Sequence, residues 1–97
     1  MQRGGWVYLL TNKPHGVLYT GVTSDLAPRI VQHREGNGGV FTRKYNCTQL
    51  VYAEWHDEID AAIAREKAIK AWPRLWKLRL IHEHNPEWRD RFDELIG

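Results

Sequence analysis

Arg29 and His33, four positions apart, are the residues of this 97-residue chain best suited to phosphate and proton chemistry. A helix advances about 100° per residue, which places both side chains beside an apolar stripe that contains Leu26 and Ile30. Arginine presents a fixed fork of N–H donors that matches phosphate oxygens, and histidine exchanges a proton near neutral pH. For an isolated arginine or histidine, an ordinary hydrogen bond or a packed aliphatic stem is the commoner explanation. The pair therefore marks a candidate site only if other groups join it.

Glu66 is the most informative acidic residue, because helical spacing places it on a face that is expected to pack inward. Its neighbours on that face are Ile59, Ala62, Ile63 and Lys70. Burying a carboxylate without a partner costs several kcal/mol, so a cation, a metal ion or several donors should accompany it. Two explanations stay open at this point: an internal ion pair and a metal ligand.

Tyr8 and Tyr19 lie on two short segments that are expected to pair as strands, so that both phenols can point to the same face. Gly21 would leave backbone exposed beside them. Strand tyrosines usually serve packing, and a phenol takes part in proton transfer only when a neighbouring cation or metal shifts its pKa from near 10. The two tyrosines gain meaning only together with Arg29 and Glu66.

The elements that must position these residues follow from short apolar runs and turn formers. We expect the order strand, strand, helix, strand, helix, helix, helix, over residues 6–10, 17–22, 25–35, 49–55, 58–72, 73–82 and 86–95. A glycine-rich loop is expected from Gly36 to Tyr45, and Asn85 followed by Pro86 predicts the start of the last helix. Trp72 and Trp76, four positions apart, are expected in the core rather than as a base-stacking platform.

Length and composition limit the class of protein. The chain is long enough for one domain, expected to cover residues 1–97, and its 42% hydrophobic content and five tryptophans argue against intrinsic disorder. The single cysteine, Cys47, excludes an internal disulfide and a paired-cysteine zinc site. Neither a membrane-spanning run nor a signal peptide is recognisable, so we expect a cytoplasmic protein.

The basic residues are concentrated in two blocks although the formal net charge is only +2. Residues 1–52 contain six Lys or Arg against two acidic residues, and residues 65–79 contain six against Glu66 alone. Such blocks permit binding of a polyanion, and solvated helix faces explain them equally well. The candidates for salt-sensitive contacts with nucleic-acid phosphates are Arg34, Arg43, Lys44, Lys67 and Lys70.

Taken in order, these residues form a pattern: Trp6-Val7-Tyr8, then Tyr19-Thr20-Gly21, then Arg29 with His33, and a later helix that carries Glu66. The pattern resembles the GIY-YIG nuclease family, and the resemblance extends along nearly the whole chain. The segments 41–46, 65–72 and 85–88 are similar to those of small stand-alone bacterial members. The resemblance implies an α+β fold in which a small mixed sheet, antiparallel at its N-terminal hairpin, is flanked by helices.

The resemblance also implies an endonuclease that hydrolyses DNA phosphodiester bonds with one divalent ion, Mg²⁺ or Mn²⁺. By similarity, Glu66 would ligate the ion and Arg29 would hold the scissile phosphate. Tyr8 would activate the attacking water as a base or relay, with Tyr19 orienting it and His33 as proton partner. Branched, damaged or single-stranded DNA is the expected substrate, with RNA and a targeting protein partner left open. The alternatives are a catalytically weak nucleic-acid-binding module and a protein-interaction domain on the same fold.

Overall fold

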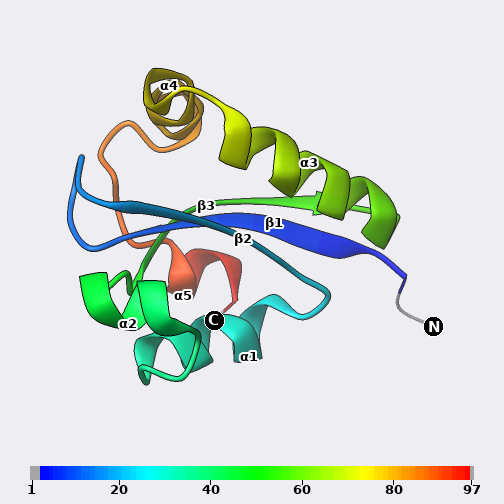
Figure 1. The fold of residues 1–97 in the computed structure, drawn as a ribbon, viewed down its shortest axis with the longest axis horizontal. Coiled ribbons are helices and arrows are strands. Elements are labelled where there is room, and N and C mark those ends of the chain that lie inside the picture. The colour runs from blue at the N-terminus through cyan, green and yellow to red at the C-terminus, as the bar shows by residue number, and fades with distance from the viewer. Residues whose placement is uncertain (1–2, 97) are drawn as a thin grey trace.

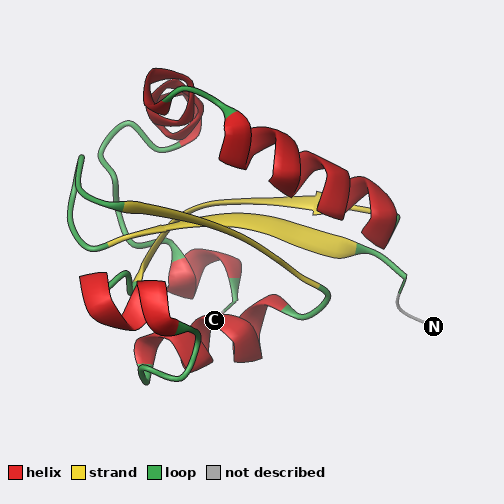
Figure 2. Ribbon diagram, viewed as in Figure 1, coloured by secondary structure: helices red, strands yellow, loops and turns green. Residues whose placement is uncertain are grey.

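The structure, a computed structural model, describes residues 3–96 and consists of a three-stranded sheet with helices on both faces. The strands are β1 (Gly5–Thr11), β2 (Leu18–Thr23) and β3 (Gln49–His56). The helices are α1 (Leu26–Arg34), α2 (Val40–Tyr45), α3 (Ile59–Ala71), α4 (Arg74–His84) and α5 (Phe92–Leu95). Figure 1 shows α3 and α4 on one side of the sheet and α1, α2 and α5 on the other, and Figure 2 separates helices from strands by colour. The predicted α+β class is confirmed.

The N-terminal hairpin, also predicted, is closed by a turn whose polar groups bond to one another. Asn12 Oδ1 accepts the backbone N–H of Val17 at 2.9 Å, and the Gly16 N–H donates to the Lys13 carbonyl at 2.9 Å. The central strand β1 pairs antiparallel with β2 on one side and with β3 on the other. Both pairings are antiparallel, so within the described residues the sheet is not the mixed one that the resemblance implies. The reason is that the helices between β2 and β3 return the chain to the far side of β1, where β3 runs against it.

Side-chain alternation along β1 creates two hydrophobic cores, because successive residues of a strand point to opposite faces. Val7 and Leu9 pack with Ile69 of α3 and other residues on one face. Tyr8 and Leu10 face the opposite core, where the apolar residues of α1 cover them. Tyr8 is thereby placed on the α1 side of the sheet. Within residues 3–96 there is no helix long and apolar enough to cross a lipid bilayer.

The segment expected as a loop up to Tyr45 contains the short helix α2. Gly39, with φ of 141°, provides the backbone turn that starts it, and the Arg43 N–H donates to the Gly39 carbonyl at 3.2 Å. Thr42 is the buried residue of α2, whereas Val40 is 74% exposed. A helix that buries a single threonine produces no apolar periodicity, so the sequence pattern did not reveal it.

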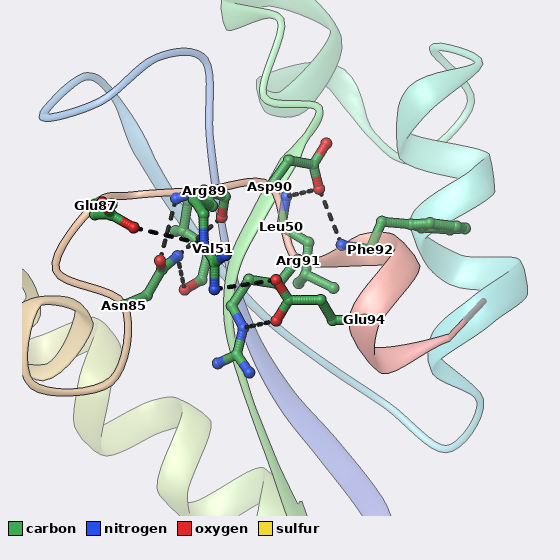
Figure 3. A network of polar contacts seen from close by, with 9 residues as sticks. All are labelled: Leu50, Val51, Asn85, Glu87, Arg89, Asp90, Arg91, Phe92 and Glu94. Carbon is green, nitrogen blue, oxygen red and sulfur yellow. Dashed lines mark hydrogen bonds and ion pairs between the residues drawn. The ribbon is translucent and has the colours of Figure 1, made fainter.

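The last helix is much shorter than the predicted span of 86–95, because Asn85 does not cap a following helix. Its amide donates to the carbonyls of Val51 at 3.1 Å and Arg89 at 2.8 Å, and its Oδ1 accepts the Arg89 N–H at 3.1 Å (Figure 3). Trp88 has a positive φ of 55°, which a continuing helix does not allow. Residues 86–91 therefore form a loop tied to β3.

We expected both Trp72 and Trp76 in the core, and this prediction is wrong for Trp76. Trp72 is half-buried, and its ring packs edge-on against the Trp76 ring with 5.9 Å between the two centroids. Trp76 is nevertheless 50% exposed, and its neighbour Leu75 is 63% exposed. Regular spacing placed both tryptophans on one helix face, yet α3 ends at Ala71 and a new helix begins at Arg74. The change of direction at Pro73 breaks the periodicity on which the prediction rested.

Candidate active site

Tyr8 lies in the middle of β1, on the sheet face that also carries Leu10 and packs on Leu26 and Ile30 of α1. Its side chain is fully buried. The ring crosses over Gly21 of the edge strand β2, its partner in the strand register, where an added Cβ would lie 2.4 Å from the Tyr8 hydroxyl oxygen. The glycine is buried beneath the phenol and does not leave the exposed backbone that we expected. Its lack of a side chain is what leaves room for the phenol against β2.

Gly21→Ala is expected to destabilise the protein by about 1–3 kcal/mol, because the added methyl group overlaps the Tyr8 ring and hydroxyl. Urea unfolding measures the free energy, and Thr23→Ala, further along the same strand, serves as a control for strand propensity. A stability within about 0.5 kcal/mol of wild type would contradict the placement of the phenol over this glycine.

His33 connects Tyr8 to Thr42 through two buried hydrogen bonds. The Tyr8 hydroxyl lies 2.9 Å from His33 Nε2, and His33 Nδ1 lies 3.1 Å from Thr42 Oγ1. The Thr42 hydroxyl donates to the Gly39 carbonyl at 3.3 Å, so its oxygen accepts a hydrogen bond from His33 Nδ1–H. This assignment leaves Nε2 as the acceptor for the Tyr8 proton. The result is a directed chain of hydrogen bonds from β1 through α1 to α2.

Burial sets the protonation of this chain. It raises the pKa of Tyr8 to about 12, although the neighbouring Arg29 guanidinium acts in the opposite direction. Burial, assisted by the positive charge of Arg29, lowers the pKa of His33 to about 4. Near pH 7 the phenol therefore keeps its proton and the imidazole is neutral. Both states match the direction of the hydrogen bonds from Tyr8 to Thr42.

The lowered pKa of His33 predicts an acid-sensitive fold. The unfolded chain takes up a proton on this residue near pH 6.5, whereas the folded protein does so only near pH 4, so unfolding binds a proton between these values. The free energy of unfolding should fall by roughly 3 kcal/mol from pH 7 to pH 4 through this group. Urea titrations of wild type, His33→Gln and the exposed control His82→Gln measure it. An equal acid loss in all three proteins would contradict the expectation.

Arg29 precedes His33 by one helical turn and is held beside the phenol. Its guanidinium donates to Gln32 Oε1 at 3.0 Å and to the Gly38 carbonyl at 3.1 Å. Hydrogen bonding with Tyr8 raises the pKa of Arg29 above its ordinary value, which keeps the guanidinium charged. The glycine-rich loop closes over the same place, since a Cβ at Gly38 would lie 2.2 Å from His33 Nδ1. Arg29 thus fixes both the loop and a positive charge next to the phenol.

Glu66 is 7% exposed on α3, which agrees with the inward position predicted from its spacing. Its Oε2 pairs with Lys70 Nζ at 2.6 Å, and Lys70 itself is half exposed. Burial is the main cause of the raised pKa of Tyr8, and the negative charge of Glu66, which lies across the sheet from α1, contributes least to it. The carboxylate is therefore part of an ion pair beside the β2 edge, where Lys70 is exposed.

Tyr19 completes the group on β2. Its ring centroid lies 6.3 Å from that of Tyr8 and 5.3 Å from that of His33. It borders an open hollow of about 270 Å³ along the β2 edge, which is lined by Leu18, Tyr19, Thr20, Phe41, Lys70 and Lys77. Tyr8, Tyr19, Arg29 and His33 thus lie together on the α1 side of the edge strand, and Glu66 joins them from the α3 side through its ion pair with Lys70, which lines the same hollow.

The five predicted nucleic-acid contacts have different surroundings. Arg34 Nη2 lies 2.5 Å from Asp90 Oδ2, and the guanidinium carbon of Arg34 lies 4.2 Å from the centroid of the Phe92 ring. These contacts fasten the C-terminal loop to α1. Lys70 pairs with Glu66 at the hollow. The others are exposed on α2 and α3, namely Arg43, Lys44 and Lys67. Arg34 could reach a phosphate only by giving up its structural contacts.

Sequence reasoning missed Thr42, Phe41 and Lys77 as members of the site. Thr42 lies in the segment 41–46 that contributed to the family resemblance, but its bond to His33 depends on the unpredicted helix α2. Lys77 belongs to α4, and its Nζ donates to the Lys70 carbonyl at 3.3 Å. Its position in the sequence, after the end of α3, gives no indication that it lies beside the site.

The donor set determines which metal the site can accept. In the part of the chain that the structure describes, no three His, Cys, Asp or Glu side chains are grouped as metal ligands. A single buried carboxylate beside the β2 hollow does fit Mg²⁺, which keeps several waters and is commonly held by one or two carboxylates together with substrate phosphate oxygens. Glu66 is the residue that would hold it, after Lys70 has moved away.

The hairpin, the pair of tyrosines and the carboxylate on α3 define a GIY-YIG catalytic domain, and the model of that family matches residues 4–79. The chain belongs to the GIY-YIG family. Its members are nucleases, which act on nucleic acid and generally use a divalent metal ion.

Two sets of relatives are similar over most of their length. A UPF0213 protein of Staphylococcus saprophyticus is 40% identical over 78 residues, covering 80% of this chain and 94% of that protein. A UPF0213 protein of Staphylococcus aureus strain Mu50 is 40% identical over 68 residues, covering 70% and 83%. The solution NMR structure of the UPF0213 protein BH0048 from Bacillus halodurans has a TM-score of 0.57 and 28% identity, covering 90% of this chain and 92% of that one. These relatives share the small single-domain architecture.

Proposed function

We propose that this chain is a stand-alone endonuclease that hydrolyses DNA phosphodiester bonds with one divalent ion, Mg²⁺ or Mn²⁺, in the cytoplasm. The observation that carries the proposal is the meeting of Tyr8, Tyr19, Arg29, His33 and Glu66 at the β2 edge. A phosphate-binding cation, a proton acceptor behind a phenol and a buried carboxylate are the groups that phosphodiester hydrolysis needs.

Arg29 binds the scissile phosphate in this proposal. Its charge is fixed beside Tyr8, and a guanidinium can offer two parallel N–H donors to phosphate oxygens. The same contact stabilises negative charge that develops on those oxygens during attack. Because Arg29 is already oriented by Gln32 and the Gly38 carbonyl, little reorganisation accompanies substrate binding.

Tyr8 relays the proton of the attacking water. The water oxygen forms the new bond to phosphorus as the bond from phosphorus to the 3′ oxygen breaks, its proton passes to the phenol oxygen, and the phenol proton moves to Nε2 of His33 over 2.9 Å. The bound phosphate offsets the Arg29 charge that helps to lower the pKa of His33, which lets the imidazole accept this proton during the reaction. Thr42 keeps the imidazole in the tautomer that accepts at Nε2. Tyr19 lies beside Tyr8 and orients the water. We assign the proton transfer to Tyr8 and the orienting role to Tyr19, because the hydrogen bond to His33 is made by Tyr8.

Glu66 would hold the divalent ion, which when bound neutralises phosphate charge and stabilises the leaving 3′ oxygen. Lys70 then has to leave the carboxylate, and its half-exposed position permits this. Lys70 and the exposed Arg43, Lys44 and Lys67 contact backbone phosphates in a salt-sensitive way. These contacts carry little sequence information, so the proposal includes no base-specific target.

A nicking assay on supercoiled plasmid tests the proposal. Wild-type protein in Mg²⁺ or Mn²⁺ is expected to open the plasmid, EDTA is expected to stop the reaction, and Arg29→Ala is expected to lower the rate by about a hundredfold or more. Lys13→Ala, in the exposed hairpin turn, is the matched control for loss of one positive charge. Undiminished cleavage by Arg29→Ala would indicate a contaminating nuclease and overturn the proposal.

The ion pair between Glu66 and Lys70 favours one competing function, a nucleic-acid-binding module without turnover. In such a protein the lysine would serve as the permanent counterion of the carboxylate. Salt-sensitive binding to DNA, together with an absence of cleavage in Mg²⁺, Mn²⁺ and Co²⁺, would support this second function over the first.

A further inference from the structure

The helix α2 exposes apolar side chains beside the candidate active site. Val40 is 74% exposed, Phe41 42% and Tyr45 39%, while Thr42 points inward to His33. Single exposed apolar residues are normal on protein surfaces. Phe41 and Tyr45 pack on each other and Phe41 lines the hollow at β2, whereas Val40 lines a separate hollow with Gly39 and Arg43. Two exposed rings in contact beside the site form a patch rather than scattered residues.

The exposed rings continue the aromatic contacts of the site. The ring centroids of Tyr8 and Tyr19 are 6.3 Å apart, those of Tyr19 and Phe41 are 6.0 Å apart, and those of Phe41 and Tyr45 are 4.8 Å apart. The series begins at the buried phenol and ends on the surface of α2. A strand of substrate that leaves the phosphate at Arg29 in this direction would pass over Phe41 and then Tyr45.

Positive charges accompany these rings. The hollow at the β2 edge has Tyr19 and Phe41 from one layer of the fold and Lys70 and Lys77 from the other. Lys44 Nζ lies 5.3 Å from the centroid of the Tyr45 ring. An apolar protein partner would have no use for cations around the rings. A polyanion with flat apolar groups matches both features.

We propose that Phe41 and Tyr45 form a stacking platform for unpaired nucleobases of the strand that is cut, with Lys70 and Lys77 contacting its phosphates. This inference rests on the proposed nuclease function and specifies its substrate class as single-stranded or locally unpaired DNA. In a duplex each base is stacked on both faces and paired along its edge, so a protein ring cannot reach a base face. Aromatic side chains bind single strands with little sequence preference, because every base has a π-face.

Binding measured without cleavage tests the platform separately from the nuclease function. Fluorescence anisotropy in EDTA compares a labelled 20-nucleotide oligothymidine with a labelled 20-base-pair duplex. Phe41→Leu keeps apolar bulk against Tyr19 and removes the ring, and Tyr45→Leu does the same at the outer position. Phe41→Trp retains a ring as the conservative variant. Trp76→Leu, an equally exposed aromatic residue that lines a different groove on α4, is the control.

Wild type is expected to bind the oligothymidine more tightly than the duplex, and each leucine variant is expected to weaken that binding by roughly tenfold while the duplex affinity changes little. Phe41→Trp and Trp76→Leu should bind like wild type. Equal affinity for both DNAs, or leucine variants that bind the oligothymidine normally, would overturn the inference. Ring-dependent binding, with no cleavage of either the oligothymidine or the plasmid in Mg²⁺ or Mn²⁺, would keep the platform and reject the nuclease, whereas cleavage with ring-independent binding would do the reverse.

Discussion

Glu66→Gln is expected to lower the rate of metal-dependent DNA cleavage by about a thousandfold or more. Glutamine keeps the shape of the side chain and removes the charge that attracts a divalent ion. The free energy of unfolding should change by less than about 1 kcal/mol, because the partner Lys70 is half exposed and returns to water when the ion pair is lost. Single-turnover plasmid cleavage and urea unfolding, run in parallel, measure the two effects.

DNA binding separates this effect from a general loss of affinity. Lys70 is free to contact phosphate once its carboxylate partner is gone, so Glu66→Gln should bind DNA in EDTA at least as well as wild type. Glu83→Gln, which removes an exposed carboxylate from α4, serves as the charge-matched control and should cleave normally. Cleavage by Glu66→Gln at more than about a tenth of the wild-type rate would show that this carboxylate holds no catalytic ion.

Tyr8→Phe is expected to lower the cleavage rate by about a hundred- to ten-thousandfold, the range found when a positioned proton-transfer group is removed. The substitution deletes the hydroxyl that donates to His33 Nε2 and leaves the ring in place over Gly21. A buried imidazole nitrogen then lacks its partner, which should cost about 1 kcal/mol of stability. Single-turnover rates corrected for the folded fraction measure the catalytic part.

Tyr19→Phe is the informative comparison, since it removes a phenol of the same site. In the proposed scheme Tyr19 only orients the water, so its loss should reduce the rate by about tenfold or less. If Tyr19→Phe were the more damaging of the two, the proton would leave through β2 and the path from Tyr8 to His33 would not be the catalytic one.

Much of the site was predictable because its residues sit on elements with strong local signals. Short runs of apolar and aromatic residues predict the two strands of the hairpin, and a two-residue period then allows Tyr8 and Tyr19 to share one face. A 100° step per residue predicts that Glu66 faces inward on its helix, and the structure has it 7% exposed. These inferences need only the geometry of a single element or one short turn.

The rest depended on contacts between distant segments. The helix α2 buries only Thr42, so no periodic pattern announces it, and the bond from Thr42 to His33 follows from how the glycine-rich loop folds back. The loop after Asn85 is fixed by the hydrogen bond from the Asn85 amide to the Val51 carbonyl on β3, 34 positions away, which competes with the helix that Pro86 favours locally. Tertiary hydrogen bonds of this kind outweigh local propensity and leave no trace in sequence spacing.

A crystal structure of the protein with Mn²⁺ and a short oligonucleotide carrying an uncleavable phosphorothioate linkage tests the central claim most directly. We expect anomalous density for the ion in contact with the Glu66 carboxylate, Lys70 moved from its 2.6 Å pairing, and a phosphate against Arg29 within reach of the Tyr8 hydroxyl. Glu66 still paired with Lys70, with the ion and the phosphate bound elsewhere, would contradict the assignment of this edge of the sheet as the catalytic centre.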